Sequence, residues 1–401
     1  MTLSSPWRGD FPGILALEKE GQTYLDSAAT SQKPQALTAA LTDYYARGTA
    51  NVHRAQHLPA ERATRAFEAS RAKVAHWLNA DSPGQIIFTR GCTEAINLLA
   101  YALEEQFHPG DQLVIGAAEH HANLLPWQQL ALRRGLELVV LPLDADGAID
   151  LTEAARLIGP QCRLLAIGQL SNVLGRWQPL AELLALARAR GALTVVDGAQ
   201  GAVHARPDVQ ALDCDFYAFS AHKLYGPEGV GVLYGRAEAL QRLEHWQFGG
   251  EMVQVADYRS ATFRPPPLGF EAGTPAIGAV IALGSTLDYL LGLDAEAVAR
   301  HEAALHARLL EGLRQRDGLR VLGAPEVALA SFVVEGVHNA DLAQLLGEQG
   351  IAVRAGHHCA MPLYASLGLG GAVRVSLGLY NDGADLERFF AALDRALELL
   401  R

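Results

Sequence analysis

Between residues 85 and 234 the chain alternates short apolar runs with amphipathic stretches. The apolar runs predict seven buried strands, at 86–88, 113–115, 138–141, 164–167, 195–196, 216–219 and 230–234. The stretches between them predict helices that begin at Thr93 and lie near 122–134, 151–158 and 179–190. Apolar strands alternating with helices are typical of a mostly parallel sheet covered on both faces. We therefore expect an α/β fold built on a seven-stranded sheet.

After Pro275 the pattern changes, and strands and helices no longer alternate one by one. Two helices are expected near 277–291 and 295–316, followed by strands at 320–322, 330–334, 352–354 and 373–377. In the last helix one apolar stripe recurs every three or four residues, at Leu386, Phe389, Phe390, Leu393, Leu397 and Leu400. This pattern predicts a second, smaller α+β domain.

The length of 401 residues suits two domains. We expect a large domain over 20–270 and a small domain made of 1–19 and 271–401. Half of the residues are hydrophobic and 19% are charged, which is the balance of a globular enzyme. The formal net charge of -11 repels phosphate backbones and argues against nucleic-acid binding.

Targeting segments, disulfides and metal sites are not expected. Residues 1–13 contain no apolar core segment, so no secretory signal is predicted and we expect a cytoplasmic location. The apolar run 276–293 is interrupted by Asp288, and a buried helix explains it better than a membrane span. The four cysteines show no CxxC or regular spacing, which argues against a disulfide framework and a zinc site.

One lysine stands in the loop between the last two strands of the predicted sheet. Lys223 follows Ser220-Ala221-His222 and precedes a glycine-containing turn. A lysine that is kept dry has a lowered amine pKa and becomes a nucleophile toward carbonyl groups, which suggests a Schiff base. The alternative is a solvated lysine between glycine turns.

A carboxylate lies at a matching place upstream. Asp197 closes the apolar run 193–196, so we expect it at the carboxyl end of a strand, where open α/β sheets bind ligands. Pyridoxal phosphate (PLP) requires a lysine for its aldehyde and a buried acid that keeps its ring nitrogen protonated. Lys223 and Asp197 together therefore point to a PLP enzyme.

The sequence around these two residues is similar to a known group of enzymes. Val196 to Gln200, followed by Ser220 to Lys223, resembles the class V aminotransferase group of fold-type I PLP-dependent transferases. Arg354 to Pro362 narrows the resemblance to the type II cysteine desulfurases of the Suf and Csd kind, also called selenocysteine lyases. The resemblance extends from about Tyr24 to the last helix and implies a large PLP-binding domain beside a smaller α+β domain.

The phosphate of the cofactor is expected where a strand ends and a helix begins, at Cys92 and Thr93. Free backbone N–H groups and the positive end of the helix dipole point outward there. An ordinary helix N-cap is the alternative interpretation. The resemblance assigns Ser220 and His222 to the same phosphate, whereas Cys92 departs from the Gly-Thr-Thr-Glu pattern of the family.

Two adjacent histidines follow the strand predicted at 113–115. An imidazole there can stack on the PLP ring and act as an acid or a base, and the resemblance gives this role to His120. His121 is expected to be a structural hydrogen-bonding residue. Metal binding is the alternative, but adjacent residues of a strand point to opposite faces and no Cys or carboxylate completes a ligand set.

Two amide side chains follow predicted strands on the same edge of the sheet. Asn172 would donate to the phenolic oxygen of the cofactor or to the substrate carboxylate, and Gln200 would contact the same phenolic oxygen. An ordinary turn or cap is the alternative for each of them.

Arg374 interrupts an otherwise apolar strand. A guanidinium there can bind a carboxylate through two parallel hydrogen bonds, and the family has its substrate-carboxylate clamp at this position. A solvated arginine on an edge strand is the alternative. Arg354 is a second candidate for the substrate carboxylate.

The resemblance also implies contributions from a second subunit. Ala28, His53 and Arg54 belong to segments that resemble those closing over the substrate, partly from the neighbouring subunit. Thr274 resembles the residue that reaches the neighbouring subunit's phosphate. We therefore expect an obligate homodimer with shared sites.

Cys359 distinguishes between the reactions open to a PLP enzyme. Two histidines precede it and Pro362 follows it, in a short turn that starts at Gly356 and can present a thiol. Basic neighbours favour the thiolate, which can take the sulfur from PLP-bound cysteine. Cys162 and Cys214 are expected to be inert core residues.

These residues predict a PLP-dependent cysteine desulfurase with Lys223, Cys359 and His120 as catalytic residues. L-cysteine would become L-alanine, and the sulfur would pass as a persulfide on Cys359 to a small acceptor protein of the SufE/CsdE kind, as in iron–sulfur cluster assembly. Selenocysteine is a further expected substrate.

Two alternatives stay open. One is a PLP-dependent aminotransferase or another amino-acid lyase of the class V group, which would not need Cys359. The other is a sulfur-relay scaffold without activity, against which the presence of Lys223, Asp197 and Arg374 argues.

Overall fold

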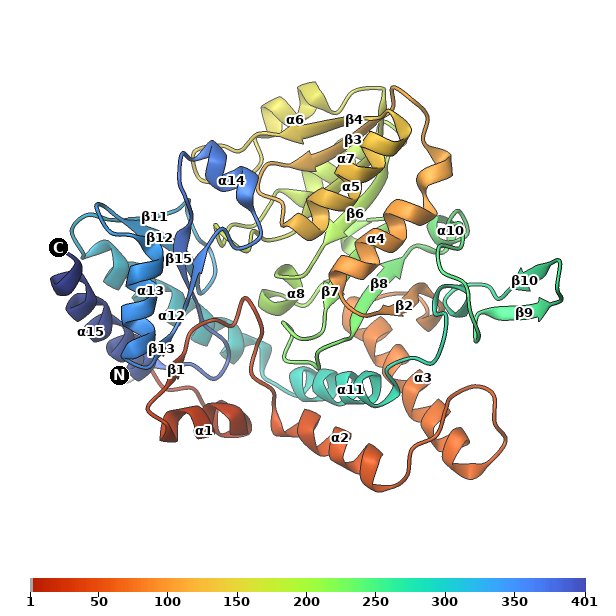
Figure 1. Ribbon diagram of the computed structural model, residues 1–401, viewed down its shortest axis with the longest axis horizontal. Coiled ribbons are helices and arrows are strands. Elements are labelled where there is room, and N and C mark those ends of the chain that lie inside the picture. The colour runs from red at the N-terminus through yellow and green to blue at the C-terminus, as the bar shows by residue number, and fades with distance from the viewer. Residues whose placement is uncertain (1–2) are drawn as a thin grey trace.

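A seven-stranded sheet forms the centre of the computed structural model, which describes residues 3–401 (Figure 1). In spatial order the strands are β2 (Ile86–Thr89), β8 (Gly231–Gly235), β7 (Phe216–Ser220), β6 (Leu193–Asp197), β5 (Cys162–Gly168), β3 (Gln112–Gly116) and β4 (Glu137–Leu141). Strand β8 is antiparallel to both neighbours, and the other neighbouring pairs are parallel. The predicted α/β fold with a mostly parallel, seven-stranded sheet is therefore confirmed.

The strands are apolar on both faces because helices cover both faces. Leu113 and Ile115 of β3 pack into a core with helices α4 and α5, whereas Val114 between them packs into a second core with α3, α7 and α11. The helices of this part are α2 (Gln35–Ala46), α3 (Leu58–Leu78), α4 (Cys92–Ala102), α5 (His121–Arg134), α6 (Leu151–Leu157), α7 (Leu180–Arg188), α8 (Gly201–His204), α9 (Val209–Leu212), α10 (Ala237–Leu240) and α11 (Ile277–Leu291).

A second sheet of four antiparallel strands lies beside the first. Its spatial order is β11 (Leu319–Val321), β12 (Leu329–Val334), β15 (Ala372–Ser376) and β14 (Arg354–Gly356). Helices α12 (Ala295–Arg314), α13 (Asn339–Glu348) and α15 (Gly383–Leu400) gather around it (Figure 1). In α15 the residues Leu386, Phe389, Leu393 and Leu397 of the predicted stripe are buried in one core with Phe332 of β12, and Phe390 and Leu400 are partly buried against it.

The single strand predicted at 352–354 is wrong, because two strands with different partners share this segment. Strand β13 (Ile351–Ala352) pairs with β1 (Thr23–Tyr24), and β14 starts at Arg354 and pairs with β15. The remaining elements are α1 (Pro12–Lys19), α14 (Met361–Ser366), the hairpin of β9 (Val253–Ala256) and β10 (Ala261–Phe263), and the 3-10 helices η1 (Arg8–Asp10), η2 (Pro83–Gln85), η3 (Glu104–Gln106) and η4 (Leu268–Phe270).

Helix α11 lies on the side of the large sheet, although the expected boundary at residue 270 assigned it to the small domain. Its residues Ile277, Val280 and Leu283 belong to the core that also contains α3. The expected domain boundary at residue 270 stays a prediction. The packing of α11 argues for placing that boundary after residue 291, where α11 ends.

Over residues 3–401 no single helix is long and apolar enough to cross a membrane. Helices α11 and α12 are long and apolar enough for this only if they are counted as one helix, but the chain bends by 87° between them.

Candidate active site

A pocket of about 490 Å³ opens at the carboxyl ends of the parallel strands, between the large sheet and the β14–α14 segment. The predicted site residues that line it are Ala28, Cys92, Thr93, His120, Asn172, Asp197, Gln200, Ser220, His222, Lys223, Arg354, Cys359 and Arg374. Three predicted residues, His53, Arg54 and Thr274, are not part of its lining. Chain segments far apart in sequence therefore supply one cavity.

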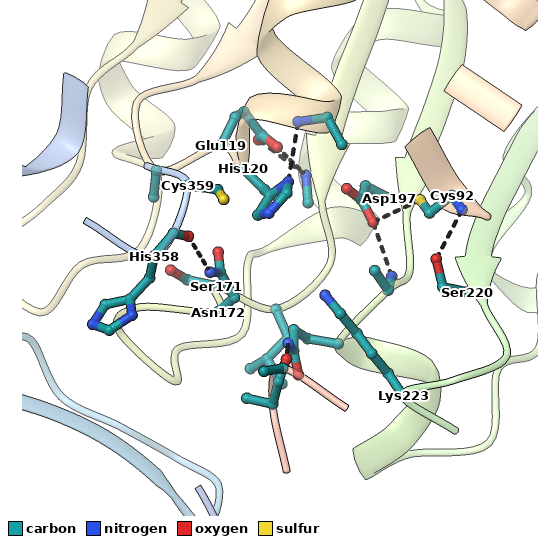
Figure 2. Close-up of a pocket in the computed structure, with 18 of the residues that line it drawn as sticks. Cys92, Glu119, His120, Ser171, Asn172, Asp197, Ser220, Lys223, His358 and Cys359 are labelled. Atoms are coloured by element: carbon teal, nitrogen blue, oxygen red, sulfur yellow. Dashed lines mark hydrogen bonds between the residues drawn. The ribbon is translucent and has the colours of Figure 1, made fainter. Parts of the chain in front are cut away.

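Lys223 reaches into this pocket from the turn between β7 and β8 (Figure 2). Surrounding protein atoms desolvate its ammonium group and lower the pKa of the amine, while the nearby Asp197 opposes that shift. Lys223 is partly buried and lines the pocket, which argues against the solvated-lysine alternative. An amine with a lowered pKa is the nucleophile that an aldehyde cofactor requires.

Asp197 is the last residue of β6 and is 7% exposed. Its Oδ1 accepts hydrogen bonds from the Cys92 thiol at 3.3 Å and from the Ala199 N–H at 2.9 Å. Among residues 3–401 no donor reaches Oδ2, so this oxygen is left for a ligand in the pocket. The carboxylate is thus fixed through one oxygen and presented through the other.

The predicted phosphate cradle lies at the start of α4, where Gly91 is the N-cap. The Cys92 N–H donates to Ser220 Oγ at 2.8 Å, and the next two N–H groups have no carbonyl of their own helix to bind. A Cβ on Gly231 of β8 would lie 2.4 Å from Gly91 Cα, so glycine is required for this close approach. Burial and the positive charge of Lys223 lower the pKa of His222 to about 4, which makes it a neutral partner for phosphate oxygens.

His120 lies on the pocket wall directly before α5. Its Nδ1 accepts the Ala122 N–H at 3.0 Å, so the ring hydrogen is on Nε2. Burial and the positive charge of Lys223 lower the pKa of His120 to about 4. The ring is therefore neutral and presents one N–H donor.

His121 points elsewhere, because its Nε2 accepts the Met361 N–H at 3.2 Å. The expectation that His121 is a structural hydrogen-bonding residue is confirmed. Among residues 3–401 no group of three or more His, Cys, Asp or Glu side chains is arranged to hold a metal ion.

Glu119 also lines the pocket, although no role was predicted for it from the sequence. It is buried and accepts hydrogen bonds from Asn123 Nδ2 at 2.7 Å and from the Gly168 N–H at 2.9 Å. Burial nevertheless raises the pKa of Glu119 to about 8. The available signal was its place at a strand end, directly before His120.

The two predicted amides also hold neighbouring chain segments in place. Asn172 Nδ2 donates to His358 O at 2.8 Å, and Gln200 Nε2 donates to Ala28 O at 2.8 Å. Gln200 Oε1 is buried without a partner among the described residues. Both amides line the pocket, and their roles toward a cofactor or substrate stay predictions.

Arg374 is 2% exposed and lies on β15, between β12 and β14, so the alternative of a solvated arginine on an edge strand is excluded. Its Nη1 donates to Asn172 O at 3.0 Å and its Nη2 to Asp26 Oδ1 at 3.2 Å. Its Nε is buried without a partner within residues 3–401. Arg354 binds the same Asp26 at 2.9 Å, so two cations share one carboxylate and an excess of positive charge remains for a substrate carboxylate.

Cys359 is the one exposed cysteine of the four. It follows β14 in a turn where His358 and Cys359 both have positive φ, at 47° and 58°. Burial lowers the pKa of His358 to about 3, and its ring turns away from Cys359 to donate to Ala372 O (Figure 2). The expectation of a basic His358 is wrong because this ring is buried. The cationic side chains that line the same pocket as Cys359 are instead Arg354, Lys223 and Arg374.

The other cysteines are poor nucleophiles because they are buried. Burial raises the pKa of Cys162 to about 11 and that of Cys214 to about 12. The thiol of Cys92 is buried beside the Asp197 carboxylate, and its pKa is also raised. The expectation that Cys162 and Cys214 are inert core residues is confirmed.

The residues expected from a second subunit form contacts of their own. His53 pairs with Glu68 at 2.9 Å, and Arg54 pairs with Glu251 at 2.8 Å. Thr274 lies in the segment that precedes α11. Their roles in a shared site stay predictions.

The residues present fit PLP. The first turn of α4 and Ser220 offer hydrogen-bond donors for a phosphate, and the unpaired Oδ2 of Asp197 offers an acceptor for a protonated ring nitrogen. Lys223 supplies the amine for the aldehyde, and His120 supplies a neutral ring on the pocket wall.

Comparison with known proteins identifies the family. The chain matches the family model for aminotransferase class-V over residues 23–389. A probable cysteine desulfurase of Pseudomonas putida is 71% identical over 397 residues, which is 99% of both chains. Cysteine desulfurase CsdA of Escherichia coli is 44% identical over 395 residues, 98% of both chains.

Solved structures agree with these relatives. The crystal structure of E. coli CsdA in its S-sulfonic acid form has a TM-score of 0.93 at 43% identity and covers 98% of both chains. The apo structure of a cysteine desulfurase from Thermococcus onnurineus has a TM-score of 0.94 at 36% identity and covers 99% of both chains. The predicted resemblance is confirmed: the chain belongs to the class-V aminotransferase family, within its type II, Csd-like cysteine desulfurases.

Proposed function

We propose that this protein converts L-cysteine to L-alanine, with PLP held by Lys223 and with Cys359 as the carrier of the removed sulfur. The observation that carries this proposal is one pocket lined by Lys223, Asp197, Arg374 and the exposed Cys359. An aminotransferase would use the first three of these residues and would have no use for an exposed thiol in the cavity.

The α-carboxylate of the substrate is assigned to Arg374. Its guanidinium is held by Asp26 and by Asn172 O, so its orientation is fixed before a substrate arrives. A fixed guanidinium loses little conformational entropy when it binds a carboxylate through two hydrogen bonds. Arg354, on the other side of Asp26, adds positive charge at the mouth of the pocket.

Proton transfer is assigned to Lys223 and His120. When bound, PLP withdraws electrons from the Cα of the substrate and weakens its C–H bond. Lys223 takes the Cα proton at Nζ, because its lowered pKa leaves a larger share of the amine unprotonated. His120 has its hydrogen on Nε2 and serves as the donor on the pocket wall.

Sulfur transfer is assigned to Cys359. Its thiolate attacks the sulfur of the substrate, so an S–S bond forms while the Cβ–S bond breaks and the electron pair of that bond goes to Cβ. Cβ takes a proton and becomes the methyl group of alanine. The thiol is oxidised to a persulfide while Cβ is reduced, so the step needs no further oxidant or reductant.

The test measures alanine formed from L-cysteine by the PLP-loaded protein. The parent should form alanine and a persulfide on Cys359, whereas Cys359→Ala should keep the bound-cofactor absorption band and lose nearly all desulfuration. Cys162→Ala is the matched control, because Cys162 is buried in β5 and does not line the pocket. Desulfuration by Cys359→Ala at the parent rate would contradict the assignment of the sulfur carrier.

One further substrate and one protein partner belong to this proposal. Selenocysteine should also react, because a selenol is more acidic than a thiol and leaves more easily. The persulfide on Cys359 should pass to the thiol of a small acceptor protein of the SufE/CsdE kind, because the short turn between β14 and α14 gives Cys359 little reach. Alanine formation should therefore rise when such an acceptor is added.

A homodimer with shared sites is also part of this proposal. His53, Arg54 and Thr274, which the resemblance assigns to a site shared between subunits, lie outside the pocket of their own chain, and this supports the proposal. Sedimentation of the active protein tests it, and a fully active monomer would contradict it.

A further inference from the structure

The starts of two helices lie next to the Cys359 turn, and His121 connects them to it through two hydrogen bonds. Helix α5 begins at His121 and helix α14 begins at Met361. The His121 N–H donates to Cys359 O at 2.7 Å, and the Met361 N–H donates to His121 Nε2 at 3.2 Å. The first N–H of a helix has no carbonyl partner within that helix, so each of these bonds satisfies a group that would otherwise lack one. His121 therefore donates one hydrogen bond to Cys359 through its backbone and accepts another from Met361 through its ring.

The turn that His121 holds has an unfavourable backbone. His358 and Cys359 are consecutive non-glycine residues with positive φ, in the left-handed region that L-residues with a side chain rarely adopt. The carbonyls of both residues are bound from the large sheet, because Asn172 Nδ2 donates to His358 O at 2.8 Å and the His121 N–H binds Cys359 O. Such a conformation persists only where its surroundings hold it.

We propose that His121 is a positioning residue that fixes where the thiol of Cys359 stands in the pocket. The inference rests on the proposed function, in which the thiolate must meet the substrate sulfur in line with the Cβ–S bond. Without the ring, the Met361 N–H loses its acceptor and the start of α14 is released on one side of the cysteine. The turn then relaxes toward the favoured backbone region, which redirects the Cα–Cβ bond of Cys359 away from the substrate.

The geometry also says which substitution retains the contact. The ring accepts through Nε2, so the required group is an acceptor about two bonds beyond Cγ. The His121→Gln side chain carries an amide oxygen at that reach, whereas the His121→Asn amide is one methylene shorter. Both variants keep the backbone N–H that binds Cys359 O. The pair therefore differs in the reach of the acceptor and not in polarity.

The test compares His121→Gln, His121→Asn and the parent by two measurements. The first is the rate at which iodoacetamide alkylates Cys359 in the protein as purified, followed by peptide mass. The second is kcat and KM for L-cysteine in the PLP-loaded protein. His108→Ala is the control, because the His108 side chain is 78% exposed and lies outside the pocket lining.

His121→Asn should lower kcat by about tenfold to a hundredfold at a nearly unchanged KM, and should change the alkylation rate at least about threefold. His121→Gln should stay within about twofold of the parent in both measurements, with an unchanged melting temperature. Equal losses in both variants, or parent-like values in His121→Asn, would overturn the proposal. A parent that forms no alanine would refute the proposed function, while the alkylation rates would still decide the role of His121. If His121→Asn does not fold, a His121→Gln protein with altered alkylation would overturn the proposal by itself.

Discussion

The two ends of the active-site pocket are built in different ways. At one end, Lys223 and Asp197 belong to the turns and strand ends of the large sheet, whose two faces are each covered by a hydrophobic core. At the other end, Cys359 lies exposed on a turn of the second sheet, in an unfavourable backbone held by hydrogen bonds that cross from the first. The first arrangement fixes a group by packing, and the second fixes a group by a few directional contacts.

This difference matches what each group must do. A cofactor-binding lysine serves the same site in every turnover, so a desolvated and immobile position suits it. A sulfur carrier must meet the substrate inside the pocket and then hand its sulfur to a partner outside, so it must stay accessible. Mutations at the two ends should therefore fail in different ways.

The largest effect is expected at the lysine end. Lys223→Ala should lower alanine formation by about a thousandfold or more, because among the residues lining the pocket no second lysine can replace it. The measurement is alanine release together with the visible absorption band of bound PLP. Lys33→Ala is the comparison variant, because Lys33 lies nearby and binds His222 O at 3.0 Å. Activity of Lys223→Ala near that of the parent would remove the central assignment.

The next effect is expected at the cysteine end and depends on the substrate. Cys359→Ala should lower desulfuration of cysteine by about a hundredfold or more and should lower selenium release from selenocysteine less. The reason is that a thiolate is a poorer leaving group than a selenolate and so depends more on attack by Cys359. Alanine formed from each substrate measures this, and an equal loss on both would contradict the leaving-group argument.

A smaller effect is expected where the two ends meet. Arg374→Lys should raise KM for cysteine by about tenfold to thirtyfold with a smaller change in kcat, because a lysine retains the charge but loses one of two parallel hydrogen bonds. Arg354→Lys, at the exposed side of Asp26, should change KM by about threefold or less. Equal effects of the two variants on KM would contradict this expectation and would mean that Arg374 and Arg354 both bind the substrate carboxylate.

The smallest effect is expected on stability, at Glu119. Burial raises the pKa of Glu119 from 4.5 to about 8, so the folded state holds this proton more tightly than the unfolded state. Its contribution to the free energy of unfolding is fully present below pH 4.5 and is lost as the pH rises through about 8. Glu119→Gln cannot ionise, so the melting temperature of the parent should fall relative to this variant by about 2 to 4 °C between about pH 6 and pH 9. Parallel melting curves would show that Glu119 is not protonated in the fold.

The large sheet could be predicted from sequence because its signal is local. Each strand contains a short apolar run, and several of these runs lead directly to a site residue, such as Asp197 after Val196. Helix α3 gave a weaker signal because many residues on its buried face are alanine, including Ala60, Ala63 and Ala75. Periodicity also does not say which neighbour a helix packs against, which is why the helix at 277–291 was expected and its place beside α3 was not.

The missing parts of the site depend on contacts between distant segments. Asp26 lies in a segment expected near the site, but its bridge between Arg354 and Arg374 joins residues more than 300 positions apart, which no local pattern encodes. The neutral state of His358 follows from burial beside Ala372 O, which the sequence does not reveal. The lowered pKa of Lys223 could be expected from its neighbours in sequence, whereas the neutral state of His358 and the bridge made by Asp26 could not.

The contact between Gly91 and Gly231 limits how the phosphate end of the pocket can vary. Any side chain at residue 231 would press its Cβ into the backbone of residue 91, at distances that real atoms do not adopt. The two positions are constrained in different ways: position 231 is closed to every other amino acid, whereas position 92 must keep a small side chain, because its N–H donates to Ser220 and its buried thiol donates to Asp197. A saturation library over both loops should return a single residue at 231 and, at 92, only small residues that can donate to Asp197. Adaptation of cofactor affinity in this protein therefore has to proceed through side chains and not through a change in the spacing of the two loops.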